Sequence, residues 1–308
     1  MLVKRFEKNP ILTAKEVPYP VVTVHNAAVV KHQKQYIMLF RSHKRNGRSI
    51  LGKAVSHDGF HFKVDNKPFM EPATSGIFKE YEAYGVEDPR IVSIEGHYLI
   101  TYSAYSSNGV RIGLAQTDDF VHLERISLIT EADYRNVVIF PEKFEGFYAR
   151  LDRPHSEISP WSIWISYSPD LVHWGQSQLI MKPLPYHWDE MKIGPGATPI
   201  RTPRGWLNIY HGVFPTMDGS VYRLGVALHD LKNPAKIIAV GDEWILQPKD
   251  PWELTGYVHN VVFSCAAVPE EDGFLKLYWG GADTVMCAGT ANIEALVDHC
   301  LEPSRPPM

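Results

Sequence analysis

The residues with the clearest chemical potential lie in segment 84–91 (YGVEDPRI), where two acids, a glycine and a proline interrupt an apolar approach to a strand. A proline disfavours helical geometry in the residue before it, so Pro89 pushes Asp88 towards an extended conformation and holds its carboxylate in one direction. A carboxyl group aimed in one direction suits general acid catalysis. We therefore predict that Asp88 is a proton donor. The alternative is a solvated turn in which Glu87 and Asp88 pair with Arg90.

Cationic side chains next to glycine or proline follow at the edges of later predicted strands. An arginine after a strand is usually a surface ion pair, but cations that converge from successive units on one axis would bind an oxyanion such as phosphate. The candidates for this phosphate site are Arg135, Arg150, Arg153, Lys192 and His211.

Other polar and aromatic residues suit a sugar. Segments 25–28 and 40–45, which contain Asn26, Arg41 and Arg45, carry hydrogen-bonding groups for hydroxyls, and Asp283 adds a carboxylate near the end of the chain. Aromatic rings combine an apolar face with a polar edge, and the candidates for stacking on a sugar face are Tyr105, Trp188 and Tyr222.

These residues must be positioned by a repeated β architecture. A signature of small polar residue, x, Asp, x, x, His and an apolar residue occurs at Asp58, Asp119 and Asp170, and a degenerate copy occurs at Asp230. Each copy follows runs of β-branched and aromatic residues that are typical of strands, and a fifth region from Leu275 repeats the strand character without the signature. Units of roughly 50 to 60 residues, each with several strands, predict an all-β, five-bladed β-propeller. The rival fold, a β-sandwich, gives no reason for a polar signature to recur at this spacing.

In this interpretation the signatures are structural. The aspartate binds local backbone amides, and an aromatic residue or the histidine plugs the space between blades. His61, His122 and His173 are therefore not expected to be catalytic. We expect one catalytic domain over 1–308, with residues 1–20 as an N-terminal extension and 290–302 as a short helix whose N-cap is Asn292. Such an extension could pack on its own chain or on a second copy, which leaves a homo-oligomer open.

The bulk composition excludes several classes of protein. The net charge is −4, from 31 basic and 35 acidic residues without long runs of either sign, so no nucleic acid and no anionic membrane is expected as a partner. The sequence has neither an apolar stretch of signal-peptide type nor a run of about 18 apolar residues, and we expect a cytoplasmic protein. Cys265, Cys287 and Cys300 form no metal-type pair, and we expect buried, reduced thiols and no metal.

The candidate residues also discriminate between two attacking groups. An inverting hydrolase needs a second carboxylate that activates water. Inorganic phosphate needs no such base, because it is already an anion and needs only cations that hold it in line with the anomeric carbon. One aimed aspartate together with several cations therefore favours phosphate as co-substrate.

Four segments carry a resemblance to a known family: 84–91, 140–143 (FPEK), 164–170 (WISYSPD) and 209–213 (IYHGV). Through them the chain resembles glycoside hydrolase family 130, the β-mannoside phosphorylases and related mannosidases, over most of its length. The resemblance implies a five-bladed propeller and an inverting phosphorolysis that yields α-mannose 1-phosphate without a cofactor. It also implies that Asp88 is the general acid and that its proton passes through the mannose 3-hydroxyl.

The resemblance assigns further roles by matching motif. It implies that Arg153, Lys192 and His211 bind phosphate, with Arg150 as the alternative to Arg153, and that Arg135 and Asn136 lie close to phosphate and mannose. It implies that the contacts to mannose or to the acceptor sugar are Asn26, Arg41, Arg45 and Asp283. The hydrolytic members lack these cations and carry glutamates.

Several alternatives stay open at this point. A β-mannosidase would use Glu87, Glu142 or Asp283 as its base. A carbohydrate-binding propeller would hold the sugar without cleaving it, and a glycosidase for another sugar could share the scaffold. The likeness of the motifs favours β-1,4-linked manno-oligosaccharides or mannosyl-glucose and mannosyl-N-acetylglucosamine as substrates, with β-1,2-mannobiose phosphorolysis as the alternative.

Overall fold

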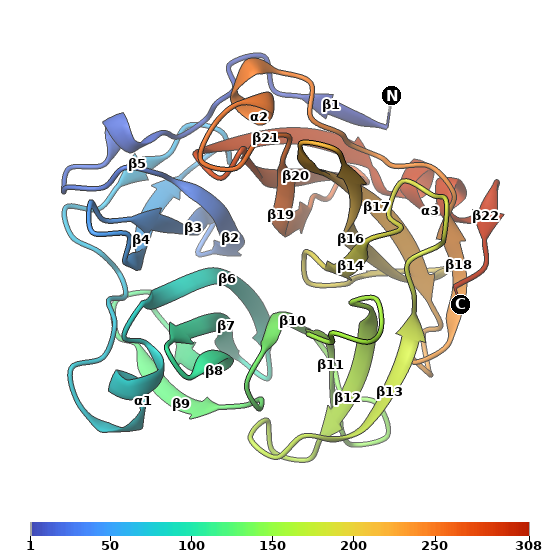
Figure 1. Cartoon of the computed structure of the whole chain (residues 1–308), viewed down its shortest axis with the longest axis horizontal. Coiled ribbons are helices and arrows are strands. Elements are labelled where there is room, and N and C mark those ends of the chain that lie inside the picture. The colour runs from blue at the N-terminus through green and yellow to red at the C-terminus, as the bar shows by residue number, and fades with distance from the viewer. Residues whose placement is uncertain (1, 308) are drawn as a thin grey trace.

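The computed structural model describes residues 2–307, and the chain is 52% strand and 7% helix. Short antiparallel sheets surround a central axis (Figure 1), and they fall into five units in chain order. Units 1 and 2 belong to one continuous sheet, but only one parallel residue pair, Ser49 with Gly85, joins them. The fold is therefore mostly β, as the strand-rich sequence predicts.

The first three units are built alike, and each strand pairs with the next along the chain. Unit 1 consists of β2 (His25–His32), β3 (Gln35–His43), β4 (Ser49–Ser56) and β5 (Lys63–Val64). Unit 2 consists of β6 (Gly85–Ile94), β7 (His97–Ser106), β8 (Gly109–Thr117) and β9 (Glu124–Leu128). Unit 3 consists of β10 (Tyr134–Ile139), β11 (Tyr148–Pro154), β12 (Ile163–Ser168) and β13 (Gly175–Met181).

The last two units recruit strands from the ends of the chain. Unit 4 contains β14 (Lys192–Pro195), β15 (Ile200–Thr202), β16 (Gly205–Thr216), β17 (Gly219–His229) and β18 (Ile237–Gly241), and β22 (Ser304–Arg305) pairs with β18. Unit 5 contains β19 (Val262–Pro269), β20 (Phe274–Gly281) and β21 (Val285–Asn292), and the N-terminal β1 (Val3–Arg5) pairs with β21 (Figure 1). The start of the chain thus completes the sheet that the end of the chain builds.

Helices are few and short. They are the 3₁₀ turn η1 (Ala14–Glu16), α1 (Gly76–Tyr81), α2 (Pro251–Leu254) and α3 (Ile293–Leu301). The side chain of Asn292 accepts a hydrogen bond from the amide of Ala295, which caps α3 as the sequence predicts. No helix within residues 2–307 is long and apolar enough to cross a bilayer.

Five apolar cores lie between neighbouring units and close the ring. Side chains of units 1 and 2 share one core, which includes Leu39 and Ile100, and units 2 and 3 share the next, which includes Leu114 and Ile139. Corresponding cores join unit 3 to 4, 4 to 5 and 5 to 1. Because every sheet buries both faces against its neighbours, the apolar burial fixes the sheets around a common axis.

The recurring Asp-x-x-His signatures are turns at the outer side of the units. Asp58 Oδ1 accepts hydrogen bonds from the amides of Phe60 and His61, and its Oδ2 contacts His61 Nδ1 at 2.7 Å. The same contacts recur at Asp119 and at Asp170, which confirms the turn role. Of the two kinds of residue predicted to fill the space between units, the histidine is excluded, because all three imidazoles are largely exposed. The aromatic residue does so at two copies, where Phe60 and Phe120 pack into cores between neighbouring units.

The three cysteines, Cys265, Cys287 and Cys300, are free and buried, as the sequence predicts. Cys265 and Cys287 lie in unit 5 and Cys300 lies in helix α3, where they pack as small apolar side chains.

Candidate active site

A cavity of about 360 Å³ lies at the axis of the ring, and all five units contribute to its wall. The innermost strands of the five units in Figure 1, namely β2, β6, β10, β14 and β19, all contribute to the wall, and β3, β11 and β17 add Arg41, Arg153 and Tyr222. The lining residues are Asn26, Arg41, Asp88, Arg135, Asn136, Arg153, His155, Trp161, Lys192, Tyr222, Val258, Val261, Phe263 and Asp283. The structure therefore brings most of the predicted site residues together.

β-Bulges turn equivalent residues of the first three units towards this axis. The pairing register shifts between His25 and Ala28, between Glu87 and Arg90, and between Arg135 and Val138. The residues inside these bulges, Asn26, Asp88 and Asn136, have φ values of 49°, 49° and 61°. A bulge re-aims a side chain, and asparagine and aspartate tolerate the left-handed region better than most residues.

Asp88 therefore differs from its sequence-based expectation in one respect. Its φ lies in the left-handed region, so the bulge aims the carboxylate, and the extended conformation expected from Pro89 is not adopted. The carboxylate is buried, with 6% of the residue exposed, so the alternative of a solvated turn is wrong. A non-glycine residue at positive φ costs about 1–3 kcal/mol, and such residues cluster at functional sites.

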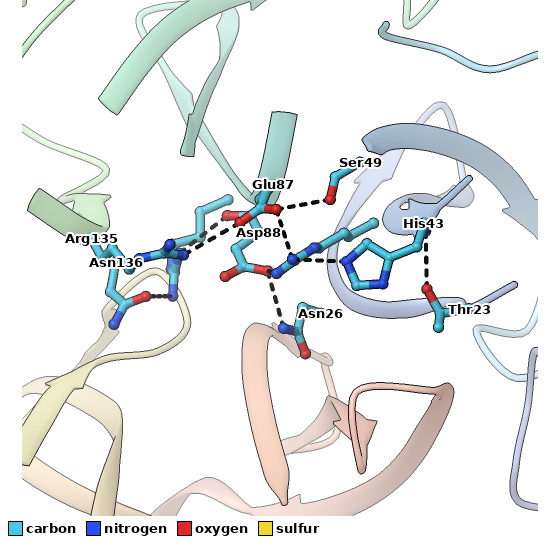
Figure 2. Close-up of polar contacts among 10 residues, drawn as sticks. Thr23, Asn26, His43, Ser49, Glu87, Asp88, Arg135 and Asn136 are labelled. Carbon is cyan, nitrogen blue, oxygen red and sulfur yellow. Dashed lines mark hydrogen bonds and ion pairs between the residues drawn. The ribbon is translucent and has the colours of Figure 1, made fainter. Parts of the chain in front are cut away.

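The Asp88 carboxylate is held by neighbours from unit 1. Its Oδ1 accepts hydrogen bonds of 3.0 Å from Asn26 Nδ2 and from Arg41 Nη1 (Figure 2). Burial alone would raise the pKa of Asp88, but the charges of Arg41 and Arg135, the Asn26 hydrogen bond and the charge of Arg90 outweigh burial and hold it well below its usual range. This low pKa keeps Asp88 ionised, so the carboxylate must gain a proton before it can donate one.

The opposite part of the cavity is rich in cations. Among residues 2–307, Arg153 and Lys192 form no ion pair with a carboxylate, and their charges lie over the ring of Trp161 at 5.1 and 4.6 Å. Burial, followed by the charges of Arg153 and Arg135, lowers the pKa of Lys192 to about 8. Arg153 is 4% exposed and its Nε has no hydrogen-bond partner. Buried cations without counter-charge are costly, so this wall is preorganised for an anion.

His211 lies behind the two cations and is neutral. Burial, together with the charges of Arg153, Arg90 and Lys192, holds its pKa well below the usual value. Its Nε2 lies 3.2 Å from Arg153 Nη1 and 3.5 Å from Asn136 Nδ2, so it accepts from these donors and supports their orientation. His211 is absent from the cavity wall itself, although it was predicted to bind phosphate.

Asp283 and Tyr222 complete the wall from units 5 and 4. Burial raises the pKa of Asp283 to about 6, while Arg41 opposes this shift and the Asp88 and Glu87 charges add to it. The ring of Tyr222 stacks on His211 with centroids 6.2 Å apart, and Lys192 Nζ lies 5.4 Å from the Tyr222 centroid. Both residues are therefore placed to contact a ligand in the cavity.

Besides His211, two predicted site residues do not line the cavity. Arg150 donates from Nε to Asp152 Oδ2 at 2.9 Å and from Nη1 to the carbonyl of Ile129 at 2.7 Å, so its charge is already neutralised elsewhere. This separates Arg150 from Arg153, which does line the cavity. Arg45 is exposed in the hairpin between β3 and β4 and is not a lining residue.

Two aromatic candidates are also displaced. Trp188 is buried in the core between units 3 and 4, where its Nε1 donates to the carbonyl of Asp242. Tyr105 packs edge-on against Tyr84 outside the lining set.

Sequence reasoning missed five lining residues, His155, Trp161, Val258, Val261 and Phe263, and also Arg90, which lies next to Asp88 outside the lining set. Arg90 is 3% exposed and donates to the carbonyls of Gly196, Pro195 and Asp88, so it ties unit 2 to unit 4 below the cavity. His155 and Trp161 stack at 4.1 Å in the loop between β11 and β12. The loop follows directly on Arg153, and this adjacency was the available signal.

No group of three or more histidine, cysteine, aspartate or glutamate side chains among residues 2–307 is placed to hold a metal ion. A buried carboxyl group, cations without a counter-charge and a ring of β-sheets around both fit the class of glycoside phosphorylases.

Comparison with known proteins gives this class a family. The model of the family described as "beta-1,4-mannooligosaccharide phosphorylase" matches residues 2–302. A 1,2-β-oligomannan phosphorylase from a Thermoanaerobacter species is 37% identical over 95% of this chain and 97% of its own. A β-1,4-mannooligosaccharide phosphorylase from Ruminococcus albus is 30% identical over 97% of this chain and 90% of its own.

Among solved structures, the β-1,2-mannobiose phosphorylase from Listeria innocua in complex with β-1,2-mannobiose superimposes with a TM-score of 0.90. The two chains are 29% identical, and the match covers 98% of this chain and 100% of the other. The chain belongs to glycoside hydrolase family 130, and it is a β-mannoside phosphorylase of that family.

Proposed function

We propose that this enzyme cleaves terminal β-1,2-linked mannosides with inorganic phosphate and releases α-mannose 1-phosphate. The sequence motifs favoured β-1,4 linkage, but the relatives named for β-1,2-mannosides are 36–38% identical to this chain, whereas those named for β-1,4-linked substrates are 30–31% identical. The alternative of β-1,2 phosphorolysis therefore becomes the leading proposal.

The observation that carries the use of phosphate is the wall of unpaired cations that shares one cavity with Asp88. In the reaction, a phosphate oxygen attacks the anomeric carbon of the terminal mannose while the bond to the glycosidic oxygen breaks. The leaving oxygen takes the proton that Asp88 supplies, and attack from the opposite face converts a β-mannoside into an α-phosphate.

The low pKa of Asp88 couples its protonation to the binding of phosphate in this scheme. Bound phosphate offsets the positive charge of Arg135 and of the neighbouring cations, and this charge is one of the causes that lower the pKa of Asp88. Phosphate binding therefore favours the protonated acid, and the proton becomes available when the attacking group is in place.

The five units are proposed to be the blades of a β-propeller. This proposal is supported by the closed circle of five cores between neighbouring units and by β1, which pairs with the last sheet. The innermost strand of each blade would then deliver one set of side chains to the axis.

Water is the rival attacking group, and the surroundings of the glutamates disfavour it. Glu142 is partly exposed, its carboxylate lies 3.6 Å from Arg201, and it does not line the cavity. Glu87 is bound by two arginines and a serine. Asp283 is the remaining candidate base, and its pKa of about 6 is compatible with either a sugar contact or a base.

The experiment that tests the function runs in both directions. In the cleavage direction, β-1,2-mannobiose with phosphate should give α-mannose 1-phosphate, and equal release of free mannose without phosphate would show a hydrolase. In the synthesis direction, α-mannose 1-phosphate with mannose, glucose or N-acetylglucosamine should release phosphate fastest with mannose and give a β-1,2 product. A β-1,4 product would restore the first linkage prediction.

A further inference from the structure

Glu87 lies between the acid side and the phosphate side of the cavity and is itself no lining residue. Its Oε1 accepts hydrogen bonds from Arg41 Nη2 at 2.7 Å and from Ser49 Oγ at 2.8 Å, and its Oε2 lies 3.4 Å from Arg135 Nη1 (Figure 2). Only 4% of Glu87 is exposed. Because Glu87 does not line the cavity and its carboxylate already contacts two arginines and a serine, it is poorly placed to activate a water molecule there.

The two arginines that Glu87 holds belong to different halves of the site. Arg41, from β3, donates from Nη1 to Asp88 while its Nη2 is shared between Glu87 and His43 Nε2 at 2.9 Å. Arg135, from β10, lines the part of the cavity that contains Arg153 and Lys192. Asp88, Arg41, Glu87 and Arg135 thus form a chain of charge-assisted contacts across three units of the ring.

The negative charge of Glu87 is as important to this row of contacts as the position of its oxygens. Arg135 has no other ion pair within residues 2–307, and it lies close enough to Arg153 and Lys192 to lower their pKa values. Without Glu87, the Arg135 guanidinium would keep neither its partner nor its orientation, because like charges would repel it from the other cations.

We propose that Glu87 is a positioning residue that sets the Arg135 guanidinium for phosphate and the Arg41 guanidinium for Asp88. The inference rests on the proposed phosphorolysis and adds a residue to it. It also assigns Glu87 a role that excludes the base role considered for a hydrolase.

The test is the variant Glu87→Gln, compared in steady-state phosphorolysis and in direct titration of the free enzyme with inorganic phosphate. An amide keeps the shape and can still accept from Arg41 or Ser49, but it presents an N–H₂ group to Arg135. A charge-assisted hydrogen bond is worth enough that its loss changes an affinity by about 10- to 100-fold. We expect the phosphate KM and Kd to rise by that factor, and kcat at saturating phosphate to fall by a smaller factor.

Two further variants separate positioning from general damage. Glu87→Asp keeps the charge on a shorter side chain and should recover part of the phosphate affinity. Glu142→Gln makes the same chemical change at an exposed ion pair and should leave both constants unchanged. If Glu87→Gln does not fold, Glu87→Asp provides the test. Its shorter side chain increases the distance to Arg135, which should still raise the phosphate KM by about 3- to 10-fold.

The outcomes are distinguishable. A wild-type enzyme whose mannoside cleavage is independent of phosphate would refute the proposed function. A phosphate-dependent wild type would refute only the positioning role if Glu87→Gln and Glu87→Asp both kept wild-type phosphate KM and Kd. The positioning role would also be refuted if kcat fell by the same factor in both Glu87 variants while the phosphate KM stayed unchanged, because this pattern indicates structural damage alone.

Discussion

Lys192 offers a test in which stability and function should change in opposite directions. Its ammonium group lies over the rings of Trp161 and Tyr222 without an ion pair, and burial together with Arg153 and Arg135 lowers its pKa from 10.5 to about 8. Replacing it with methionine removes the charge and keeps an unbranched apolar side chain. We expect Lys192→Met to stabilise the phosphate-free protein and to weaken phosphate binding.

The magnitude follows from the pKa. A difference of about 2.5 units corresponds to about 3.4 kcal/mol between the charged and neutral forms, and partial solvent exposure reduces this to about 1–3 kcal/mol. The two cation–π contacts that are lost offset about 0.5–1 kcal/mol each. The net effect on the free energy of unfolding therefore lies between a loss of about 1 kcal/mol and a gain of about 2 kcal/mol, with a small gain at the centre of this range. Loss of a charge-assisted contact should weaken phosphate binding by about 10- to 100-fold.

The assay is thermal unfolding with and without phosphate. Phosphate should raise the Tm of the wild type strongly and that of Lys192→Met weakly, because a ligand stabilises only the state that binds it. Lys143→Met is the matched control: this exposed lysine pairs with Glu95, and its loss should lower the Tm slightly and leave the phosphate effect unchanged. A Lys192→Met protein that is clearly less stable than wild type without phosphate, yet responds fully to it, would refute the reasoning.

Three further predictions concern the acid, the displaced arginine and pH. Asp88→Asn should lower kcat by about 10²- to 10⁴-fold and leave phosphate binding measurable by calorimetry, and retained activity would exclude Asp88 as the acid. Arg150→Ala should lower stability by about 3–5 kcal/mol in denaturant unfolding, because it leaves Asp152 buried and unpaired, with an unchanged phosphate KM in the folded fraction. Phosphate affinity should fall as pH rises through about 8, where the ligand-free Lys192 loses its proton. Titrations of Lys192→Met should lack this fall. Without phosphate, the free energy of unfolding of the wild type, measured relative to that of Lys192→Met, should rise between pH 8 and 10.5. In this range Lys192 is already deprotonated in the folded protein but still protonated in the unfolded chain.

Much of the fold followed from local patterns. The β-branched and aromatic runs predicted the strands, and the Asp-x-x-His signatures marked turns because an aspartate can bind the amides two and three residues ahead wherever it occurs. The histidine of the signature does not fill the space between units, because the aspartate holds the imidazole on the exposed side of the turn.

The sequence predicted which types of residue form the site, but it did not settle which individual residues line the cavity. Arg150 and Arg153 are three residues apart on β11, so a period of two places them on opposite faces of the sheet. The sequence does not say which face is turned to the axis. The pairing of Arg150 with Asp152, two residues away and on the same face, decided the question.

Asn26, Asp88 and Asn136 show the same division. Their segments share a pattern of Asn or Asp near the start of an innermost strand, which could have been detected as a repeat. The bulges that turn these side chains inward depend on how each strand pairs with the next.

By itself, the sequence determined the strand content, the turns and the supply of acids and cations, because these depend on residue types and short spacings. Only the tertiary structure decided which cations lack an ion pair, namely Arg153 and Lys192, and which arginines are held by Glu87, namely Arg41 and Arg135. In the site, charge compensation joins residues 46 and 48 positions apart in the chain, as Glu87 does with Arg41 and Arg135, and no local pattern records such distances.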